Sequence, residues 1–426
     1  MQYRLKKCKN LKGSISIPGD KSISHRALLM SAIAEGKTII KNLSSCQDVQ
    51  STLHCLMKLG VHFTSNLHSI EINGQGLYGL HPSSTPLNAG NSGTTVRLLS
   101  GILAAQPFHS VISGDQYLSK RPMDRIIYPL KKMGAHIKGT KDKYLPLHIQ
   151  GKPLFSFEYH SPVASAQVKS CILLAGLYTD GDVSVTEPFP SRDHTEKMLS
   201  SFGVNIKKNN TCTIIQGVKK LKAIEIKIPG DISSAAFFIA AALLIKNSDL
   251  TLINTGINPT RTGILKALEK MGAKIFYDNV YHLNLEPVAD LNITSQELSG
   301  TTIENPLIPQ IIDEIPILAI AATQAQGETK IVDAEELRVK ETDRIHSLYV
   351  NLKAMGAEVT ELKDGLIIRG PTELHGAEIE TFGDHRIAMA FSIAGLLAKG
   401  NTIINNSECT NISFPGFFKT LEGVYA

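Results

Sequence analysis

The sequence predicts an α/β protein with two similar domains, each built from three copies of one unit around buried helices. Three observations support this prediction. The length of 426 residues exceeds what one ordinary core contains. One helix–strand signature recurs six times, and the tetrapeptide Ile-Pro-Gly-Asp occurs at 17–20 and again at 228–231. A content of 42% hydrophobic and 19% charged residues is typical of soluble globular proteins.

The recurring signature is a helical apolar pattern that leads through glycine into a strand-like run. Glycine supplies the left-handed backbone that ends a helix, so each copy predicts a helix, a turn and a strand. The copies follow one another at intervals of about 70 residues, at Gly60, Gly134, Gly203, Gly272, Gly356 and Gly423.

A second predicted helix alternates with the first and is apolar on nearly all sides. Each one runs through a short turn into a β-rich segment, within 27–43, 97–113, 171–187, 240–256, 318–334 and 392–407. Helices without a polar face are buried helices. We therefore expect three of them at the centre of each domain.

The two Ile-Pro-Gly-Asp copies mark the predicted domain boundary. We expect one domain at 20–228 and a second formed by 1–19 together with 229–426. Two hinge crossovers, near 17–20 and 228–231, would join them. A cleft between two domains is a usual ligand site, which makes this boundary the expected place for function.

Composition argues against several classes of protein. The six cysteines form no CxxC pair and the 14 histidines form no HExxH motif, so we expect reduced thiols, no metal and no cofactor. The longest apolar run, Ala235 to Ile245, is too short for a membrane span, and the N-terminus has no signal-peptide core. We therefore expect a cytoplasmic protein that binds no membrane.

The charge balance points to small anionic partners. A net charge of +5 and a pI near 8.7 indicate a mildly basic protein. The chain lacks tryptophan and has no block of like charges, whereas nucleic-acid platforms combine clustered cations with stacking aromatics. We expect no nucleic acid as partner.

Polar residues stand at the starts of the predicted buried helices. Cations are disfavoured there by the helix dipole unless an anion lies between them. Small residues and arginine at such positions bind phosphate and carboxylate well, so we predict a ligand with several negative charges. The residues are Lys21, Arg26, Gly93, Thr94, Ser165, Ala166, Gln167, Asp313 and Arg386.

Simpler interpretations exist for single stretches. An ordinary Ser/Thr cap explains 88–99 equally well, and Ser191 with Arg192 fits a charged surface turn. In 338–345, Lys340 and Arg344 are four residues apart and Glu341 precedes Arg344 by three. This spacing predicts one helix face, for which a solvated, salt-bridged surface is the alternative.

Together these segments resemble the 5-enolpyruvylshikimate-3-phosphate synthase family over nearly the whole chain. The motifs are PGDKSISHRAL (18–28), GNSGTTVRLL (90–99), SKRPMDRI (119–126), SAQVKS (165–170), PSRDHTE (190–196), RVKETDRI (338–345) and DHRIAMAF (384–391). SAQVKS, PSRDHTE and IDEIPILA (312–319) resemble the second-class bacterial branch. The resemblance implies a two-domain inside-out α/β barrel with three βαβαββ units in each domain and parallel inner helices.

The resemblance implies transfer of the enolpyruvyl group of phosphoenolpyruvate to the 5-hydroxyl of shikimate 3-phosphate, with release of phosphate. The chemistry is addition followed by elimination and needs an acid, a base and anion stabilisation. Asp313 would take the hydroxyl proton, and Glu341 or Lys21 would serve the methylene carbon.

The implied substrate contacts fall into two sets. For the assembly state we expect a monomer. Shikimate 3-phosphate would meet Lys21, Ser22, Arg26, Ser165, Ala166, Gln167, Arg192, Asp313 and Lys340. Phosphoenolpyruvate would meet Lys21, Gly93, Arg121, Gln167, Arg344 and Arg386.

Two features refine this expectation. Part of the family has a further lysine before a Phe-Pro pair, where this chain has Asn411, Ile412 and Ser413. Phosphoenolpyruvate would therefore meet one cation fewer. Gly93 keeps the small residue that the family associates with inhibition by glyphosate, so we expect inhibition.

Two other functions compete with this one. A sister enzyme that acts on UDP-N-acetylglucosamine usually carries a reactive cysteine in the loop that here spans 113–125, which contains none. The nearest, Cys171, lies in an apolar helix pattern, where a thiol is normally inert. A repeat protein binding RNA ends would explain the basic helix starts, but not Asp313 and Glu341 among them.

Overall fold

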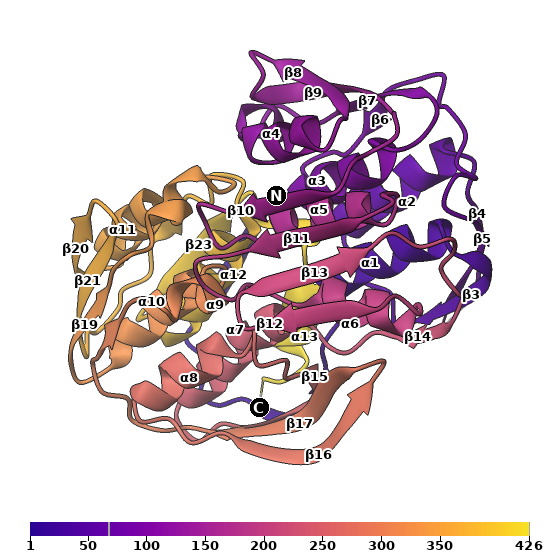
Figure 1. Cartoon of the computed structure of the whole chain (residues 1–426). Coiled ribbons are helices and arrows are strands. Elements are labelled where there is room, and N and C mark those ends of the chain that lie inside the picture. The colour runs from indigo at the N-terminus through magenta and orange to yellow at the C-terminus, as the bar shows by residue number, and fades with distance from the viewer. Residues whose placement is uncertain (67–68, 426) are drawn as a thin grey trace. The chain divides into compact units, whose positions relative to one another are not determined.

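The computed structural model describes residues 1–66 and 69–425. The chain forms two compact units, drawn in Figure 1. The N-terminal unit comprises Gly19–Ile228 and His282–Glu286. The C-terminal unit comprises Met1–Pro18, Pro229–Tyr281 and Pro287–Ala426. Within the described residues, none of the helices combines the length and the apolar character that a membrane crossing requires.

One sheet topology recurs throughout both units. In the third repeat, β10 (Phe157–His160) pairs in parallel with β11 (Asp182–Thr186). Strand β11 pairs antiparallel with β13 (Cys212–Gln216), which pairs antiparallel with β12 (Ile206–Asn209). Helix α5 (Ala166–Gly176) connects the parallel strands, and α6 (His194–Ser201) precedes the hairpin. This order is the expected βαβαββ unit.

The N-terminal unit contains two further sheets of this kind. The first has the order β14 (Glu225–Lys227), β3 (Glu35–Lys41), β5 (Ser69–Gln75), β4 (His62–Ser65). The second has the order β6 (Leu87–Asn88), β7 (His109–Ser113), β9 (Tyr144–Gln150), β8 (His136–Thr140). Their helices are α1 (Lys21–Ala32), α2 (Gln47–Lys58), α3 (Gly93–Leu103), η1 (Leu118–Lys120) and α4 (Asp124–Lys132).

The C-terminal unit contains the other three sheets. Two have four strands, in the orders β2 (Lys12–Ser16), β15 (Asp249–Gly256), β17 (Glu286–Thr294), β16 (Phe276–Leu283) and β18 (Thr302–Ile303), β19 (Gly327–Ile331), β21 (Gly365–Gly370), β20 (Glu358–Leu362). The third has three strands, β22 (Glu378–Ile379), β23 (Asn401–Asn405) and β1 (Gln2–Lys6).

The helices of this unit follow the same alternation. Those that are buried on nearly all sides are α7 (Ile232–Leu244), α10 (Ile315–Gln324) and α12 (His385–Leu397). The others are α8 (Gly263–Lys270), α9 (Ile308–Ile311), η2 (Glu335–Val339), α11 (Arg344–Ala354), η3 (Ser407–Ile412) and α13 (Phe417–Glu422).

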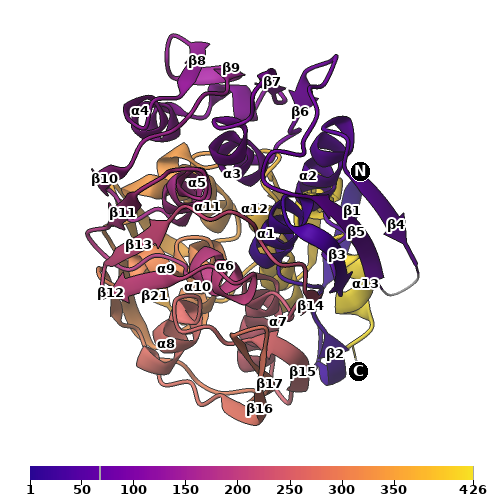
Figure 2. The same ribbon diagram turned by 45° about the vertical axis from the view of Figure 1, so that its right-hand side comes forward.

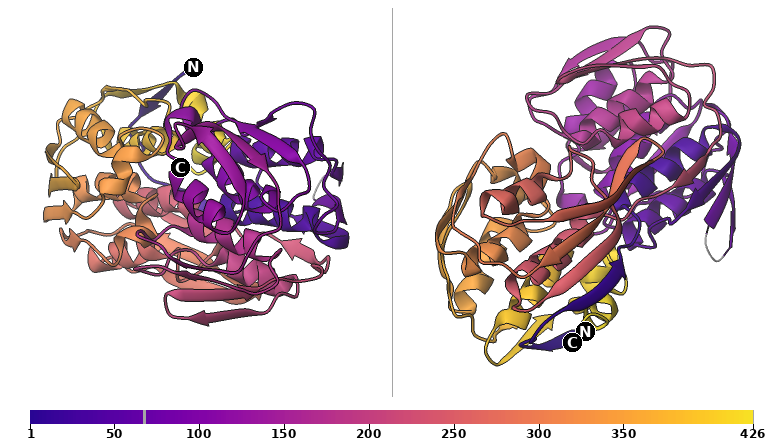
Figure 3. Two further views of the ribbon diagram at one scale, coloured as in Figure 1. Left: turned by 45° about the horizontal axis from the view of Figure 1, so that its top comes forward. Right: turned by 90° about the horizontal axis from the view of Figure 1, so that it is seen from below.

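The first strands of the chain complete sheets whose other strands come much later in the sequence. Strand β1 pairs antiparallel with β23, and β2 pairs in parallel with β15. The backbone N–H of Lys12 donates to the carbonyl of Val424 at 2.9 Å, so β2 begins beside the C-terminal segment. Figure 3 shows the indigo first strands next to the yellow C-terminal segment.

The apolar helices form the centre of each unit, as the sequence predicts. In the N-terminal unit α3 packs against α1 and α5, and the strands lie outside these helices (Figure 2). In the C-terminal unit α7 packs against α10 and α12, and every residue of α7 from Ile232 to Leu243 is buried. Full burial of such helices removes all sides from water, which accounts for their lack of a polar face.

The predicted glycine turns are confirmed in five of the six copies. Gly60, Gly134, Gly203, Gly272 and Gly356 all have positive φ, between 83° and 99°. The prediction is wrong for Gly423, whose φ is −64°. Among the described residues, no strand hairpin follows Gly423, whereas one follows each of the other five glycines.

Candidate active site

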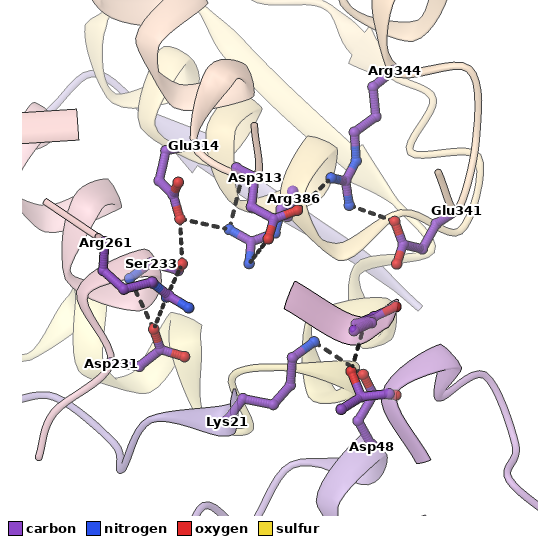
Figure 4. A network of polar contacts seen from close by, with 12 residues as sticks. Lys21, Asp48, Asp231, Ser233, Arg261, Asp313, Glu314, Glu341, Arg344 and Arg386 are labelled. Atoms are coloured by element: carbon purple, nitrogen blue, oxygen red, sulfur yellow. Dashed lines mark hydrogen bonds and ion pairs between the residues drawn. The ribbon is translucent and has the colours of Figure 1, made fainter. Parts of the chain in front are cut away.

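At the start of α1, the lysine that the helix dipole disfavours is paired with a carboxylate. Asp20 caps α1 by accepting from the backbone N–H of Ile23 at 2.8 Å. Lys21 is the first residue of α1, and its Nζ lies 3.0 Å from Oδ2 of Asp48 in the first turn of α2 (Figure 4). The carboxylate offsets the repulsion between the lysine and the helix dipole. Ser22 follows Lys21 in the same turn.

Arg26 lies in the second turn of α1 and is only 2% exposed. Its guanidinium donates to the carbonyl of Ser22 at 2.8 Å, to Oγ1 of Thr195 at 2.6 Å and to Oγ of Ser170 at 2.7 Å. These bonds join α1 to α5 and α6. A buried guanidinium requires such partners, and they fix the direction of the Arg26 side chain.

The starts of α3 and α5 are joined through Gln167. Ser92 caps α3 by accepting from the N–H of Thr95 at 3.1 Å, which confirms the capping interpretation for Ser92 itself. Gln167 Nε2 donates to Oγ1 of Thr94 at 2.9 Å, and Gln167 Oε1 accepts from Arg97. Sequence reasoning missed Arg97, although an arginine inside an apolar helix pattern is a usable signal for a buried polar site.

Gly93 leaves room for two arginine side chains at the start of α3. A Cβ atom at this position would lie 2.8 Å from an Nη of Arg97 and 3.4 Å from an Nη of Arg121. Gly93, Arg97 and Arg121 therefore lie close together. Guanidinium groups beside the N–H groups of a helix start are well suited to an anion.

Ser165 caps α5 and is itself held by a buried carboxylate. Its N–H donates to Oε1 of Glu187 at 2.9 Å, while Ser191 Oγ donates to Oε2 of Glu187 at 2.8 Å. Lys169 Nζ lies 2.9 Å from Glu187 and 2.9 Å from Glu196, and all three charged side chains are buried. Arg192, half-buried, follows Ser191 directly in the turn before α6. Sequence reasoning missed this network.

In the C-terminal unit, Arg344 is the centre of a cluster of carboxylates (Figure 4). Its Nη2 lies 2.6 Å from Glu341 Oε2, its Nε 2.8 Å from Asp384 Oδ2, and its Nη1 3.4 Å from Asp313 Oδ1. Burial alone would lower the pKa of Arg344, but the three carboxylates, Asp384 most strongly, raise it above its ordinary value. The guanidinium therefore stays charged although it is only 1% exposed.

The prediction that Lys340, Glu341 and Arg344 share one helix face is wrong. Residues 335–339 form η2, and α11 begins only at Arg344, because Asp343 accepts from the N–H of His346 and caps the helix there. Lys340 and Glu341 thus precede the helix. Glu341 still contacts Arg344, through the turn rather than along a helix face.

Lys340 is a partly buried ammonium group without a close partner. It forms no hydrogen bond or ion pair within the described residues, and burial lowers its pKa below the ordinary value. Asp313 and Glu336 offset part of this effect, and Arg344 adds to it. An oxygen of a bound anion would supply the missing contact.

Arg386 and Asp313 are brought together beside α10 and α12. Arg386 is the second residue of α12, which Asp384 caps, and its Nη1 donates to the carbonyl oxygen of Asp313 at 2.9 Å. Its Nη2 lies 4.0 Å from Asp313 Oδ2. Asp313 lies in the turn just before α10, close to its expected place at a helix start. The cluster combines a carboxylate with two cations that can bind anions.

The structure bears on two other kinds of chemistry, a metal site and a reactive cysteine. Among residues 1–66 and 69–425, no group of three or more His, Cys, Asp and Glu side chains could hold a metal ion. Cys171 is buried in α5, and burial raises the pKa of its thiol. A thiol of this kind is not the nucleophile that the rival UDP-N-acetylglucosamine enzyme would need.

Comparison with known proteins identifies the family. The family model for EPSP synthase (3-phosphoshikimate 1-carboxyvinyltransferase) matches residues 5–421. The chain belongs to this family. It is 51% identical to the 3-phosphoshikimate 1-carboxyvinyltransferase of Brevibacillus brevis over 98% of both chains. It is 49% identical to that of Desulforamulus reducens over 100% of this chain and 99% of the relative.

Solved structures agree with this assignment. The EPSP synthase of Acinetobacter baumannii superposes with a TM-score of 0.89 at 44% identity, over 100% of this chain and 98% of that one. The enolpyruvyl transferase NikO of Streptomyces tendae, at 16% identity, shares the fold with a TM-score of 0.78 over 99% of this chain and 96% of that one. The predicted two-part enolpyruvyl transferase fold is confirmed. The chain is a transferase, and its reaction moves the enolpyruvyl group of phosphoenolpyruvate to shikimate 3-phosphate in the shikimate pathway.

Proposed function

We propose that residues of both units carry out this transfer by addition followed by elimination. The 5-hydroxyl of shikimate 3-phosphate bonds to C2 of phosphoenolpyruvate while a proton adds to the methylene carbon. The tetrahedral adduct then loses a methyl proton and expels phosphate. Each stage needs a proton acceptor, a proton donor and stabilised negative charge.

We propose that one set of residues binds shikimate 3-phosphate. In the N-terminal unit, the hydroxyls of Ser22 and Ser165 and the helix start at Ala166 and Gln167 suit a phosphate group. The other members are Lys21, Arg26, Arg192, Lys340 and Asp313. Arg26 has most of its guanidinium N–H groups already bonded, so its contribution is to order Ser22 as well as to supply positive charge.

We propose that a second set binds phosphoenolpyruvate. Arg121, Arg344 and Arg386 supply guanidinium groups, which bind carboxylate and phosphate in a forked geometry. Gly93 admits the ligand to the start of α3, and Lys21 and Gln167 complete the set. The space that Gly93 leaves beside Arg121 also motivates the proposal that glyphosate inhibits the enzyme.

The observation that carries this proposal is the placement of Asp313. Its carboxylate lies between Arg344 and Arg386, so one cluster holds a proton acceptor and two anion-binding groups. A binding protein for polyanions gains nothing from carboxylates at this position, because they repel phosphate. A transferase that must deprotonate a hydroxyl beside an anionic substrate requires them.

Variants of Asp313 test the assignment directly. We expect Asp313→Asn to lower kcat by at least about a hundredfold, the usual size of general-base catalysis, in an assay of phosphate release with both substrates. Asp333→Asn is the matched control, because Asp333 is exposed and its φ of 59° suits asparagine. An Asp313→Asn enzyme as fast as the control would contradict the role of Asp313.

Millimolar glyphosate in the same assay should slow the wild-type enzyme.

Lys21 and Glu341 are the two proposed candidates for proton transfer at the methylene carbon. Lys21 and Glu341 are both ion-paired, with Asp48 and Arg344 respectively, so geometry within each unit leaves both open. We further propose that the protein is a cytoplasmic monomer, in agreement with small-molecule substrates. We also propose that it has two domains that meet at the crossovers near 17–20 and 228–231.

A further inference from the structure

The second Ile-Pro-Gly-Asp copy, at 228–231, contains none of the proposed substrate-binding residues. Asp231 caps α7 and accepts from the N–H of Ser233 at 2.9 Å. The residues that follow the first copy are a lysine and a serine of the proposed substrate site. Those that follow the second are apolar except for Ser233 and Ser234, both buried. Ser233 takes part in a chain of polar contacts that reaches Arg386.

The hydrogen bonds of Ser233 have a fixed direction. Arg261 Nη2 lies 2.6 Å from Ser233 Oγ and 3.1 Å from Asp231 Oδ1, and a guanidinium can only donate. Ser233 Oγ is also hydrogen-bonded to Oε1 of Glu314, and an ionised carboxylate can only accept. The single hydroxyl proton of Ser233 therefore points to Glu314. The residues Ser233, Arg261 and Glu314 are each at most 2% exposed.

Glu314 and Arg386 form a long ion pair without a hydrogen bond (Figure 4). The distance from Glu314 Oε1 to Arg386 Nη1 is 3.7 Å, which exceeds the range of an N–H···O hydrogen bond. Arg386 Nη1 donates to the carbonyl of Asp313 instead. The second oxygen of Glu314, Oε2, is buried and has no hydrogen-bond partner among the described residues. Among the described residues, the hydrogen bond from Ser233 and the longer ion pair with Arg386 hold this carboxylate in place.

We propose that Ser233, fixed by Arg261, is a positioning residue that keeps the Glu314 carboxylate out of hydrogen-bond range of Arg386. The guanidinium of Arg386 then remains available to a substrate carboxylate or phosphate. Without the contact, a buried carboxylate and a buried guanidinium at this separation would close into a forked pair, because their attraction is strong at low dielectric. The substrate would then compete with Glu314 for Arg386. This inference rests on the proposed role of Arg386 in binding phosphoenolpyruvate.

The test compares KM values for the two substrates in single and double variants. Ser233→Ala should raise KM for phosphoenolpyruvate about tenfold, the factor that 1.4 kcal/mol represents, with kcat and KM for shikimate 3-phosphate little changed. Ser234→Ala, one residue away on the same buried helix start, is the matched control and should resemble the wild type. Ser233→Thr keeps a hydroxyl and should restore most of the affinity.

The double variant Ser233→Ala/Glu314→Gln decides between positioning and simple damage to α7. If the defect comes from Glu314 closing on Arg386, removal of the Glu314 charge should return KM for phosphoenolpyruvate to near the wild-type value. A double variant as weak as Ser233→Ala, or weaker, would overturn the inference. So would an equal defect in Ser234→Ala. Thermal unfolding of each variant identifies any loss of folded enzyme.

One more variant distinguishes failure of this inference from failure of the proposed site. Arg386→Gln should raise KM for phosphoenolpyruvate more than Ser233→Ala does. If Arg386→Gln leaves that KM unchanged, the proposed role of Arg386 and the inference both fail. If it raises KM while Ser233→Ala has no effect, only the inference about Ser233 and Glu314 is overturned.

Discussion

At the scale of single residues, Lys21, which is half-buried, and Arg344, which is buried, have carboxylate partners from other elements. Lys21 meets Asp48, and Arg344 meets three carboxylates. The sequence motifs indicated the cations, because their residue types and spacing are local. Asp48 and Asp384 were missed because each contacts a residue far away in the sequence, and no local pattern indicates such a pair.

His25 is a buried residue whose charge state should affect stability. Its side chain is fully buried, and its Nδ1 lies 2.7 Å from Oγ1 of Thr52. Burial lowers its pKa well below the ordinary 6.5, and the nearby charges of Lys21 and Arg26 lower it further. His25 is therefore neutral in the folded protein, whereas the unfolded chain binds a proton below pH 6.5. Stability should fall as the pH drops from that value towards the folded pKa.

We expect the wild type to lose about 1.4 kcal/mol of unfolding free energy per pH unit from this one group in that window. His25→Asn lacks the titrating ring and should lose less stability on acidification. Urea unfolding at about pH 7.5 and about pH 5.5 measures the difference for each protein. Equal losses in the two proteins would contradict a neutral His25.

At the scale of elements, the apolar patterns predicted the helices better than they predicted the starts of those helices. The starts of α3, α5 and α12 lie within one or two residues of the polar positions that the sequence indicated. The start of α11 does not, because the spacing of Lys340 and Arg344 fits a helix that begins before either residue. The cap at Asp343 overrides that spacing, and periodicity carries no information about which of several polar residues caps a helix.

Helix α5 contains Lys169, whose position in the apolar helical pattern predicts that it faces the core. Lys169 is paired with Glu187 and Glu196, and the attraction of both carboxylates raises its pKa although burial opposes this. Removal of one partner from a buried network leaves uncompensated charges. We expect Lys169→Met to lower the free energy of unfolding by about 3–5 kcal/mol, measured by urea unfolding at neutral pH.

Two further variants separate charge from packing at this position. Lys169→Met/Glu187→Gln/Glu196→Gln removes all three charges and should recover a large part of the loss. Lys207→Met, on an exposed lysine of β12, is the control and should stay within about 0.5 kcal/mol of the wild type. A loss below about 1 kcal/mol for Lys169→Met would show that the network contributes little to stability.

At the scale of the whole molecule, repetition made the fold class predictable. Six glycine-terminated helices alternating with six apolar ones indicated six units before any strand was paired. The sequence could not show that the sixth sheet has three strands and takes β1 from the start of the chain. That pairing joins residues 2–6 to residues 401–405, and strand partners so distant leave no local pattern.

The site was predictable to the extent that it lies in motifs. Resemblance supplied the proposed substrate residues, and the structure adds the groups that orient several of them, such as Arg97 for Gln167 and Glu187 for Ser165. Those groups touch no implied substrate atom, so a comparison of motifs alone gives no reason to select them.

The central claim is that this chain transfers an enolpyruvyl group to shikimate 3-phosphate. The most direct test is phosphate release from phosphoenolpyruvate, measured with shikimate 3-phosphate, without an acceptor, and with UDP-N-acetylglucosamine. We expect release only with shikimate 3-phosphate, in an amount equal to the acceptor consumed. Release that requires UDP-N-acetylglucosamine, or no release with either acceptor, would contradict the account.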